Sequence, residues 1–277
     1  MSHRVAVTGS TGALGGLVAR QLTDLAPLLV VRDPSRAPDL GGEVRACSYD
    51  DAPAARAALA GVDVLFMVSA SESEVRRGQH RTFIQAAADA GVGHVVYTSF
   101  AGASPDAVFT LGRDHHDAEA AIRSSGMAFT LLRDNFYLDV LPLFTDETGV
   151  IRGPAGSGRV AAVARADVAD VAAAVLRDPG AHAGTTYTLC GPEALTLAET
   201  AARISAAQGR EVRFEDETVE AAYAWRREQY GAALWQLDAW VSTYTAIADG
   251  SLAALSDDVR RVAGREPRSL EDVLAGR

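Results

Sequence analysis

The residues of this chain whose types and spacing could do chemistry begin with Gly9, Gly12 and Gly15. A phosphate can approach the main chain closely only where no Cβ intervenes, and a helix N-terminus offers unpaired N–H groups and a partial positive charge. A short apolar run precedes the glycines and helix-spaced apolar residues follow them, which predicts a turn between a buried strand and an amphipathic helix. The pattern therefore predicts a site for a dinucleotide pyrophosphate, the alternative being a tight turn that binds nothing.

Two arginines, Arg32 and Arg36, follow the next apolar run, residues 28–31. In a dinucleotide-binding fold an acid at this position holds the ribose 2′-hydroxyl of NAD, whereas an arginine accepts the 2′-phosphate of NADP. The planar guanidinium suits a phosphate because it donates two charge-assisted hydrogen bonds. We therefore expect NADP(H) to be preferred over NAD(H), the alternatives being that both arginines are solvated or that Asp33 is a displaced ribose acid. The polar turn 48–51 is expected near the adenine.

The elements that must position these residues are strands and helices that alternate regularly from residue 5 to residue 133. This alternation indicates an α/β fold with a doubly wound parallel sheet, the Rossmann arrangement. Ligands bind such sheets at the carboxyl ends of the strands. Polar residues just past the predicted strands are therefore site candidates, among them Ser69 after strand 62–68 and Asn135 after strand 127–133. A long helix is predicted from about residue 72 to residue 90.

The regular alternation of strands and helices ends beyond residue 140. We assign residues 1–135 and 159–189 to the Rossmann domain, and residues 136–158 and 190–277 to a small, mainly helical domain. The glycine-rich stretch 149–159 is expected to be a loop or hairpin, and Asp167 to be the N-cap of a helix. The small domain holds all three tryptophans, Trp225, Trp235 and Trp240, which either stack on a planar substrate or form its core.

Composition excludes several classes of function. The formal net charge of -10 argues against nucleic acid or an anionic membrane as a partner, and no apolar stretch approaches the length of a membrane span. Two distant cysteines, Cys47 and Cys190, supply neither a disulfide framework nor a metal site, so we expect no bound metal and a reducing compartment. We also expect no signal peptide and therefore a cytoplasmic location. All 26 basic residues are arginine, which excludes a catalytic lysine of any kind.

Several motifs, in order and spacing, point to one family. They are T-G-x-T-G-x-L-G at 8–15, V-R-D-P at 31–34, Q-H-R at 79–81, Y-T-S at 97–99, N-F-Y at 135–137 and G-R-E-P-R-S at 264–269. The chain resembles the NmrA-like branch of the atypical short-chain dehydrogenase/reductases, above all its NAD(P)H:quinone oxidoreductase type 2 and triphenylmethane reductase members. This resemblance implies an NADP(H)-binding Rossmann domain and a small domain that closes over the substrate. Some members are reductases, whereas others only sense the dinucleotide.

The chain departs from the wider superfamily at its tyrosine–lysine pair, because Ala101 stands four residues after Tyr97 and no lysine exists. The resemblance places His115 where related reductases have the lysine. This histidine is expected to hydrogen-bond the nicotinamide ribose or donate a proton, the alternative being a solvated histidine on a helix face. Adjacent helical residues point about 100° apart, so His115 and His116 are a poor metal site. Tyr97 is as easily a core residue as a catalytic one.

These arguments define the predicted site. The hydroxyls of Tyr97, Ser99 and Tyr137 are expected to face the cleft, and His80 to tie its helix to a strand. The predicted catalytic residues are His115, Tyr137 and Ser99. The residues predicted to bind the cofactor are Gly9, Ser10, Thr11, Gly12, Ala13, Leu14, Arg32, Arg36, Val68, Ser69, Tyr97, Thr98, Ser99, His115, Asn135 and Phe136.

The expected activity is transfer of hydride from NADPH to a quinone or a similar planar, electron-poor substrate. The chemistry is mostly the cofactor's, so the protein supplies positioning and exclusion of water. The alternative is a non-catalytic NADP(H) sensor. We expect a monomer or homodimer.

Overall fold

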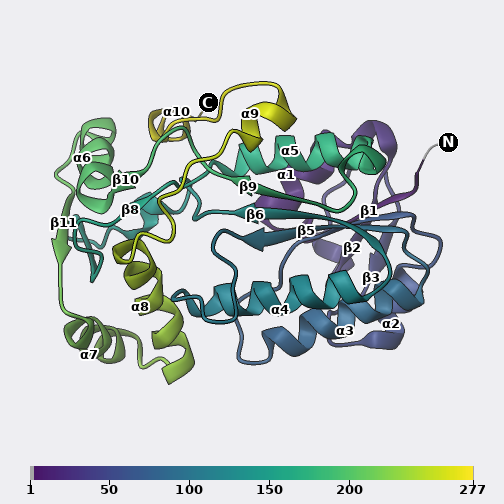
Figure 1. The fold of residues 1–277 in the computed structure, drawn as a ribbon, viewed down its shortest axis with the longest axis horizontal. Helices are drawn as coiled ribbons and strands as arrows, with labels where there is room; N and C mark the ends of the chain where they lie inside the picture. The colour runs from purple at the N-terminus through teal and green to yellow at the C-terminus, as the bar shows by residue number, and fades with distance from the viewer. Residues whose placement is uncertain (1–2, 277) are drawn as a thin grey trace.

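A computed structural model describes residues 3–276, and its centre is a seven-stranded sheet in which every neighbouring pair is parallel. The strand order is β3-β2-β1-β4-β5-β6-β9 (Figure 1). The strands are β1 (Val5–Thr8), β2 (Leu28–Val31), β3 (Val44–Ala46), β4 (Val64–Met67), β5 (His94–Phe100), β6 (Ala128–Asp134) and β9 (Thr185–Leu189). From β1 the chain adds β2 and β3 on one side of the sheet, and from β4 onward it adds strands on the other side. This reversal of strand order between β1 and β4 confirms the predicted doubly wound α/β Rossmann fold.

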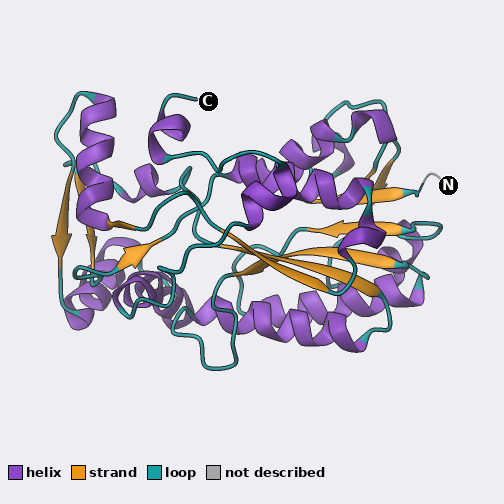
Figure 2. Cartoon of the chain, turned by 45° about the horizontal axis from the view of Figure 1, so that its top comes forward, coloured by secondary structure: helices purple, strands orange, loops and turns teal. Residues whose placement is uncertain are grey.

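Helices cover both faces of this sheet (Figures 1 and 2). One face carries α1 (Ala13–Gln21), α5 (Arg165–Arg177) and α9 (Asp258–Ala263), and the other carries α2 (Ala52–Ala58), α3 (Arg76–Asp89) and α4 (Thr110–Ser124). Because both faces are covered, the central strands are continuous apolar runs rather than alternating ones. Four short 3₁₀ helices connect elements: η1 (Thr23–Leu25), η2 (Pro34–Arg36), η3 (Leu141–Phe144) and η4 (Pro179–His182).

A smaller region packs beyond the carboxyl ends of the central strands, at the left of Figure 1, around its own apolar core. Its helices are α6 (Leu197–Gln208), α7 (Val219–Tyr230), α8 (Leu234–Ala248) and α10 (Leu270–Leu274). Its strands are β7 (Val150–Gly153), β8 (Arg159–Val160), β10 (Leu195–Thr196) and β11 (Arg213–Asp216). The region is mainly helical, as expected, while the domain boundaries stay a prediction and residues 1, 2 and 277 lie outside the described chain.

Three local expectations need correction. The stretch 149–159, expected to be a loop or hairpin, has a loop at 154–158 but is no hairpin, because β7 pairs with β11 and β8 pairs with β10. The helix predicted from residue 72 begins at Arg76. Asp167 is not an N-cap: α5 begins two residues earlier, where the N–H of Arg165 donates to Asp139 Oδ2 at 2.9 Å, and Asp167 is fully buried against the guanidinium of Arg268. The first and the third of these errors have the same source, a partner that lies far away in the sequence.

None of the helices in residues 3–276 combines the length and apolar character that crossing a membrane requires.

Candidate functional site

The glycine turn joins β1 to α1 in a conformation that only glycine allows. Gly9 has a φ of +66°, and the N–H of Gly12 donates to its carbonyl at 2.9 Å. A Cβ on Gly15 would stand 2.3 Å from that same carbonyl oxygen, so the helix can approach the strand this closely only without a side chain. The turn thus presents the bare N-terminus of α1 at the carboxyl edge of the sheet.

The polar groups of this turn suit an anion. No side chain caps α1 and its first turn holds no acidic residue, so the backbone N–H groups and the positive end of the helix dipole are uncompensated. The hydroxyl of Ser10 is buried and has no hydrogen-bond partner among the described residues. A phosphate would satisfy these donors, so the residues present fit the pyrophosphate that the sequence predicts.

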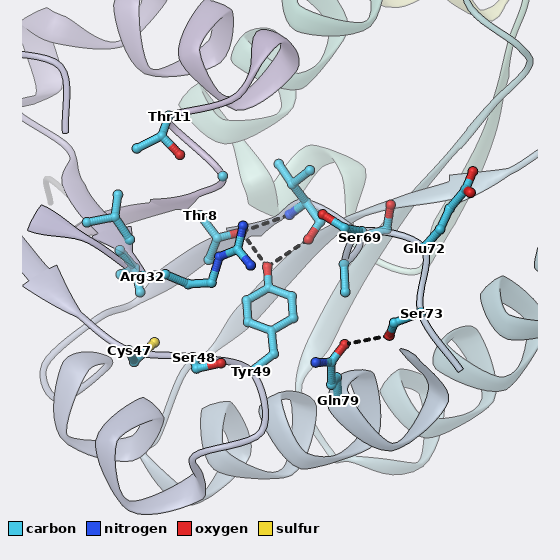
Figure 3. A pocket seen from close by; sticks show the side chains of 16 residues that line it. Thr8, Thr11, Arg32, Cys47, Ser48, Tyr49, Ser69, Glu72, Ser73 and Gln79 are labelled. Atoms are coloured by element: carbon cyan, nitrogen blue, oxygen red, sulfur yellow. Dashed lines mark hydrogen bonds between the residues drawn. The ribbon is translucent and has the colours of Figure 1, made fainter. Parts of the chain in front are cut away.

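A pocket of about 280 Å³ lies beside the turn (Figure 3). It opens at the carboxyl ends of β2, β1 and β4, which are neighbours in the sheet. Its walls are formed by Thr8, Gly9, Thr11, Val30, Val31, Arg32, Cys47, Ser48, Tyr49, Val68, Ser69, Ala70, Ser71, Glu72, Ser73 and Gln79. The expected ligand edge of the parallel sheet is therefore also where the structure is hollow.

Tyr49 forms a flat wall of this pocket. Its hydroxyl donates to the carbonyl of Val68 at 2.7 Å and lies 2.7 Å from Thr8 Oγ1 (Figure 3). Its ring stacks on Phe83 with 4.0 Å between ring centroids. Burial raises the pKa of Tyr49 above its ordinary value, so the phenol stays neutral and holds its hydrogen bonds. The contacts tie the chain after β3 to the ends of β1 and β4, close to where turn 48–51 was expected to meet an adenine.

Arg32 extends from the end of β2 into the pocket (Figure 3). Its side chain is exposed, and neither a hydrogen bond nor an ion pair to another residue in 3–276 engages the guanidinium. Asp33 does not accompany it, because the Asp33 carboxylate accepts from the N–H of Ser35 at 3.0 Å and caps η2, and these hydrogen bonds lower its pKa. Arg36 lies in η2 and does not line the pocket, so its predicted contact with the cofactor stays a prediction.

The loop between β4 and α3 forms the wall opposite Arg32 and is fixed by three contacts. The N–H of Ser69 donates to Thr98 Oγ1 at 2.8 Å, and the N–H of Ala70 donates to His80 Nε2 at 2.8 Å. The carbonyl of Ala70 accepts from Arg76 Nε at 2.8 Å. The predicted role of His80, tying its helix to the end of a strand, is confirmed. Because the chain is a loop here rather than a helix, residues 72 and 73 reach the pocket.

His115 lies inside the protein rather than at the cleft. It is 6% exposed, its Nε2 is 3.0 Å from a guanidinium nitrogen of Arg76, and its Nδ1 is 3.1 Å from the hydroxyl of Tyr97. Arginine only donates, so Nε2 must accept and Nδ1 carries the proton. Burial, then the charge of Arg76, lower the pKa of His115 well below its ordinary value. His115 is therefore neutral and both of its ring nitrogens are hydrogen-bonded within the protein. Its burial also excludes the alternative of a solvated histidine on a helix face.

The hydroxyls of β5 point away from the cleft, which corrects the expectation for Tyr97 and Ser99. Tyr97 is fully buried in the core beneath α3 and α4, and Ser99, two residues along the same face, donates to Glu119 Oε1 at 2.6 Å. Glu119 is itself fully buried and paired with Arg133. Thr98, on the other side of the strand, accepts from the pocket loop. Because successive side chains of a strand point to opposite faces of the sheet, the position of each residue along β5 decides which way its hydroxyl points.

The segment after β6 is engaged within the protein as well. The hydroxyl of Tyr137 donates to Asp134 Oδ2 at 2.8 Å, and burial raises the pKa of Asp134 to about 8. The side-chain amide of Asn135 donates to the carbonyl of Leu252 at 3.0 Å, and its oxygen accepts from the N–H of Phe136. These contacts hold the small region against the end of β6, and Tyr137 keeps its proton because burial and Asp134 raise its pKa.

The structure brings together part of the predicted site. The predicted residues that line the pocket are Gly9, Thr11, Arg32, Val68 and Ser69. Four predicted residues belong to the glycine turn or the first turn of α1 but do not line the pocket: Ser10, Gly12, Ala13 and Leu14. The other predicted residues lie elsewhere in the structure: Arg36, Tyr97, Thr98, Ser99, His115, Asn135, Phe136 and Tyr137. Sequence reasoning missed Gln79 as a pocket residue and Arg76 as a buried support. A position six residues after Ala70 gives no sign that an arginine folds back to bind its carbonyl.

Comparison with known proteins decides what the pocket belongs to. The sequence profile of the family described as NAD(P)H-binding matches residues 9–179, which include the glycine turn and five strands of the central sheet, β2 to β6. The chain belongs to this NAD(P)H-binding family. The family therefore supplies the ligand that the bare helix N-terminus and the buried Ser10 hydroxyl suit, and the predicted dinucleotide site is confirmed as an NAD(P)H-binding domain.

Relatives extend the match to the rest of the chain. Quinone oxidoreductase 2 of Escherichia coli is 37% identical over 76% of this chain and 77% of its own, and its structure with NADPH superposes with a TM-score of 0.89 over 98% and 99% of the two chains. An NAD(P)H azoreductase of Xenophilus azovorans is 32% identical over 97% and 96%. The Citrobacter sp. triphenylmethane reductase bound to NADP(H) is 31% identical with a TM-score of 0.85 over 98% and 99%. The predicted resemblance is confirmed, and this NAD(P)H-binding protein is an NAD(P)H-dependent oxidoreductase.

Proposed function

We propose that this oxidoreductase uses NADPH in preference to NADH and delivers hydride to a quinone or a similar planar, electron-poor acceptor. The cofactor preference rests on Arg32, whose guanidinium enters the pocket without an ion pair to any residue in 3–276. A site for NAD would instead need a carboxylate free to accept from the ribose hydroxyls. Asp33, the nearest carboxylate in sequence, is committed to Ser35.

The chain's own residues have three roles in this proposal. The N-terminus of α1 and the Ser10 hydroxyl hold the pyrophosphate, Arg32 holds the 2′-phosphate, and Tyr49 supports the adenosine. The loop after β4 leads the remainder of the dinucleotide along the sheet edge. When bound, NADPH supplies the hydride itself. The protein therefore contributes position and exclusion of water rather than covalent chemistry.

The acceptor is placed at the carboxyl end of β5. A pocket of about 230 Å³ lies there between the loop 100–109 and residues 249–252, with the rings of Phe100 and Phe109 in its wall. Phe136 packs on both rings, with 5.1 Å between centroids in each case. The aromatic side of the pocket suits a flat ring system, and its polar side is formed by Ser104, Asp106, Asp249 and Ser251. The relatives' names, quinone oxidoreductase and azoreductase, describe acceptors of this kind, and extending that substrate class to this chain is part of the proposal.

Proton delivery is left to solvent in this mechanism. His115 Nε2 accepts from Arg76, its pKa is lowered, and the hydroxyls of Tyr97 and Ser99 are buried within the protein. Reduction of a quinone tolerates this arrangement, because after hydride transfer the second oxygen can take its proton from water. Reduction of an unactivated ketone does not, since the developing alkoxide needs a positioned acid.

The test of the cofactor proposal compares two arginines. Arg32→Ala should weaken NADPH binding about 10- to 100-fold and leave NADH binding within about twofold, because a charge-assisted contact to a phosphate contributes roughly 1.5–3 kcal/mol. Arg36→Ala is the matched control, since Arg36 lies outside the pocket and should leave both affinities unchanged. Calorimetric titration with each cofactor gives the result. Equal losses for NADPH and NADH in Arg32→Ala would show that this arginine does not hold the 2′-phosphate.

The test of the activity follows NADPH oxidation by absorbance with a panel of quinones and azo dyes. Turnover with quinones supports the proposal. NADPH binding without turnover on any acceptor would show that the chain is a sensor of the dinucleotide rather than a reductase.

A further inference from the structure

A second aromatic pocket lies within the small region, away from the dinucleotide site. It encloses about 480 Å³ between the segment 143–152 and helices α7 and α8. The rings in its walls are those of Phe144, Trp225, Tyr230, Trp240 and Tyr244. It shares no lining residue with the pocket beside the glycine turn or with the one at the end of β5. Its walls are therefore independent of the sheet that binds NAD(P)H.

The rings form a continuous aromatic surface. Tyr230 meets both tryptophans edge to face, at 5.8 Å from the Trp225 ring and 5.5 Å from the Trp240 ring. Across the pocket, Phe144 lies 5.8 Å from Tyr244. Tyr230 is 61% exposed although it belongs to this surface, and Leu143 at the same pocket is 76% exposed. The guanidinium of Arg226 also lies over two of the rings, 5.6 Å from the centroid of Trp225 and 5.0 Å from that of Tyr244. Aromatic rings gathered around an open volume suit the faces and edges of a flat ring system.

Two unpaired polar atoms mark the same pocket. Among the described residues, five buried side-chain nitrogen or oxygen atoms have no hydrogen-bond partner, and two of them, Thr145 Oγ1 and Arg152 Nε, belong to residues that line this pocket. The two residues come from neighbouring chain segments, because Thr145 forms an isolated antiparallel bridge with Ile151. A buried donor without an acceptor is unfavourable, so a ligand oxygen that accepts from these groups would relieve that cost.

The charges around the pocket are already balanced. Arg226 pairs with Glu217 at 2.9 Å and donates to the carbonyl of Arg152 at 2.8 Å, while Arg152 pairs with Glu215 at 2.9 Å. The carboxylate of Asp146 accepts from the N–H groups of Thr148 and Val150, which helps to lower its pKa. Both arginines of the pocket wall are thus paired, and the one carboxylate in it, Asp146, is held by backbone N–H groups, so no cation is left over among the described lining residues for a ligand anion. The pocket is therefore suited to an uncharged molecule with one or more polar oxygens.

We propose that this pocket is a second small-molecule site, which binds an uncharged fused-ring aromatic carrying a hydroxyl or carbonyl oxygen. The rings of Trp225 and Trp240 stack on or against the aromatic faces, and the oxygen takes the hydrogen bonds that Thr145 and Arg152 have unpaired. The site does not depend on the proposed quinone reduction, because neither of its walls belongs to the NAD(P)H pocket. It gives the small region a binding function of its own.

The experiment uses 2-naphthol as the probe and the full chain labelled with 5-fluorotryptophan. The ¹⁹F spectrum holds one resonance for each of the three tryptophans, assigned with single Trp→Phe variants. Saturable shifts of the Trp225 and Trp240 resonances are expected. Trp235 is the internal control, because it lies on α8 but does not line the pocket, and its resonance should not move. Saturating NADP⁺ should leave the 2-naphthol affinity unchanged.

The polar half of the proposal is tested by removing one oxygen at a time. Naphthalene, which lacks the oxygen, and 2-naphthalenesulfonate, which carries a charge, should both bind more weakly than 2-naphthol. Thr145→Val should weaken 2-naphthol by about two- to tenfold, as the loss of a neutral hydrogen bond does, and Arg152→Met by about tenfold or more, because a guanidinium donor is charged. Both should leave naphthalene unchanged. Thr145→Val keeps the side-chain shape, so it tests the hydroxyl even if the arginine variant folds poorly.

Three results would overturn the proposal. The first is an equal shift of all three tryptophan resonances or the absence of any saturable shift. The second is competition between NADP⁺ and 2-naphthol, which would assign the probe to the dinucleotide site. The third is a dimer in sedimentation that Tyr230→Arg dissociates, together with no binding of 2-naphthol, which would show that the pocket is covered by a second copy of the chain.

Discussion

Two groups of polar side chains lie near the carboxyl edge of the same sheet, and they differ in whether they have partners. Beside the glycine turn, Arg32 and the Ser10 hydroxyl have none among the residues described, and the N-terminus of α1 is uncapped. Around β5 and α4, His115 and Ser99 are buried and each is hydrogen-bonded to another side chain. At the glycine turn the unpaired groups are donors that a bound anion would satisfy, whereas the paired side chains around His115 hold the fold. The comparison separates residues that bind the cofactor from residues that support its walls.

The largest expected effect comes from Gly15→Ala, which acts on the binding group alone. The new Cβ would stand 2.3 Å from the carbonyl oxygen of Gly9, so the turn and the start of α1 must separate. We expect loss of measurable NADPH binding and a decrease of about 1–3 kcal/mol in the free energy of unfolding. Calorimetric titration and urea denaturation measure the two effects.

The control for this substitution is Gly78→Ala, at an exposed position of α3 where a Cβ would meet no atom within 4 Å. This change should keep NADPH binding and stabilise the protein slightly, because alanine is the better helix former. A Gly15→Ala variant that binds NADPH normally would show that close contact between α1 and β1 is not needed.

The next effect distinguishes two adjacent arginines of α3 that both contact Asp114. Arg76 is buried and also holds the Ala70 carbonyl and His115, whereas the side chain of Arg77 is 49% exposed. Arg76→Met leaves Asp114, His115 and a loop carbonyl without that partner, which should cost about 3 kcal/mol of stability. It should also weaken NADPH, because the loop that it anchors is a wall of the cofactor pocket.

Arg77→Met removes the exposed partner of the same carboxylate and should cost less than about 1 kcal/mol. Urea denaturation of both variants, with NADPH titration of each, makes the comparison. Equal losses of stability would mean that the cluster around His115 is not a support of the pocket wall, and the distinction between the two polar groups would fail.

The contrast between the two groups also explains what could be predicted from sequence. The glycine turn and Arg32 depend on local order along the chain, a strand end followed by a turn, and the structure places both at the pocket. The burial of His115 depends on Arg76, which comes from another helix, and the direction of Ser99 depends on the parity of its strand. Asp167 resembles an N-cap in sequence, yet its partner Arg268 lies about a hundred residues later. Features that depend on neighbouring residues could be predicted from the sequence, whereas contacts between residues far apart in the sequence could not.

The smallest expected effect is a pH dependence that belongs to the supporting group alone. Burial, then the charge of Arg76, lower the pKa of His80 from 6.5 to about 3. Below pH 6.5, His80 is therefore protonated in the unfolded chain but stays neutral in the folded protein. Each unit of pH between 6.5 and 5 should cost up to about 1.4 kcal/mol of stability through this residue.

His80→Gln tests this dependence with little change of structure. Its amide oxygen can still accept from the N–H of Ala70, and His80 Nδ1 has no partner to lose. The variant should lose about 2 kcal/mol less than the wild type between pH 6.5 and pH 5 in urea denaturation. Asp134, whose pKa is raised to about 8, stabilises the fold as pH falls through the same range, but it does so in both proteins and cancels in the difference. NADPH affinity should not follow this pH dependence, because none of the buried histidines lines the pocket. If the free energy of unfolding changed with pH by the same slope in the wild type and in His80→Gln, His80 would titrate alike in the folded and unfolded chains.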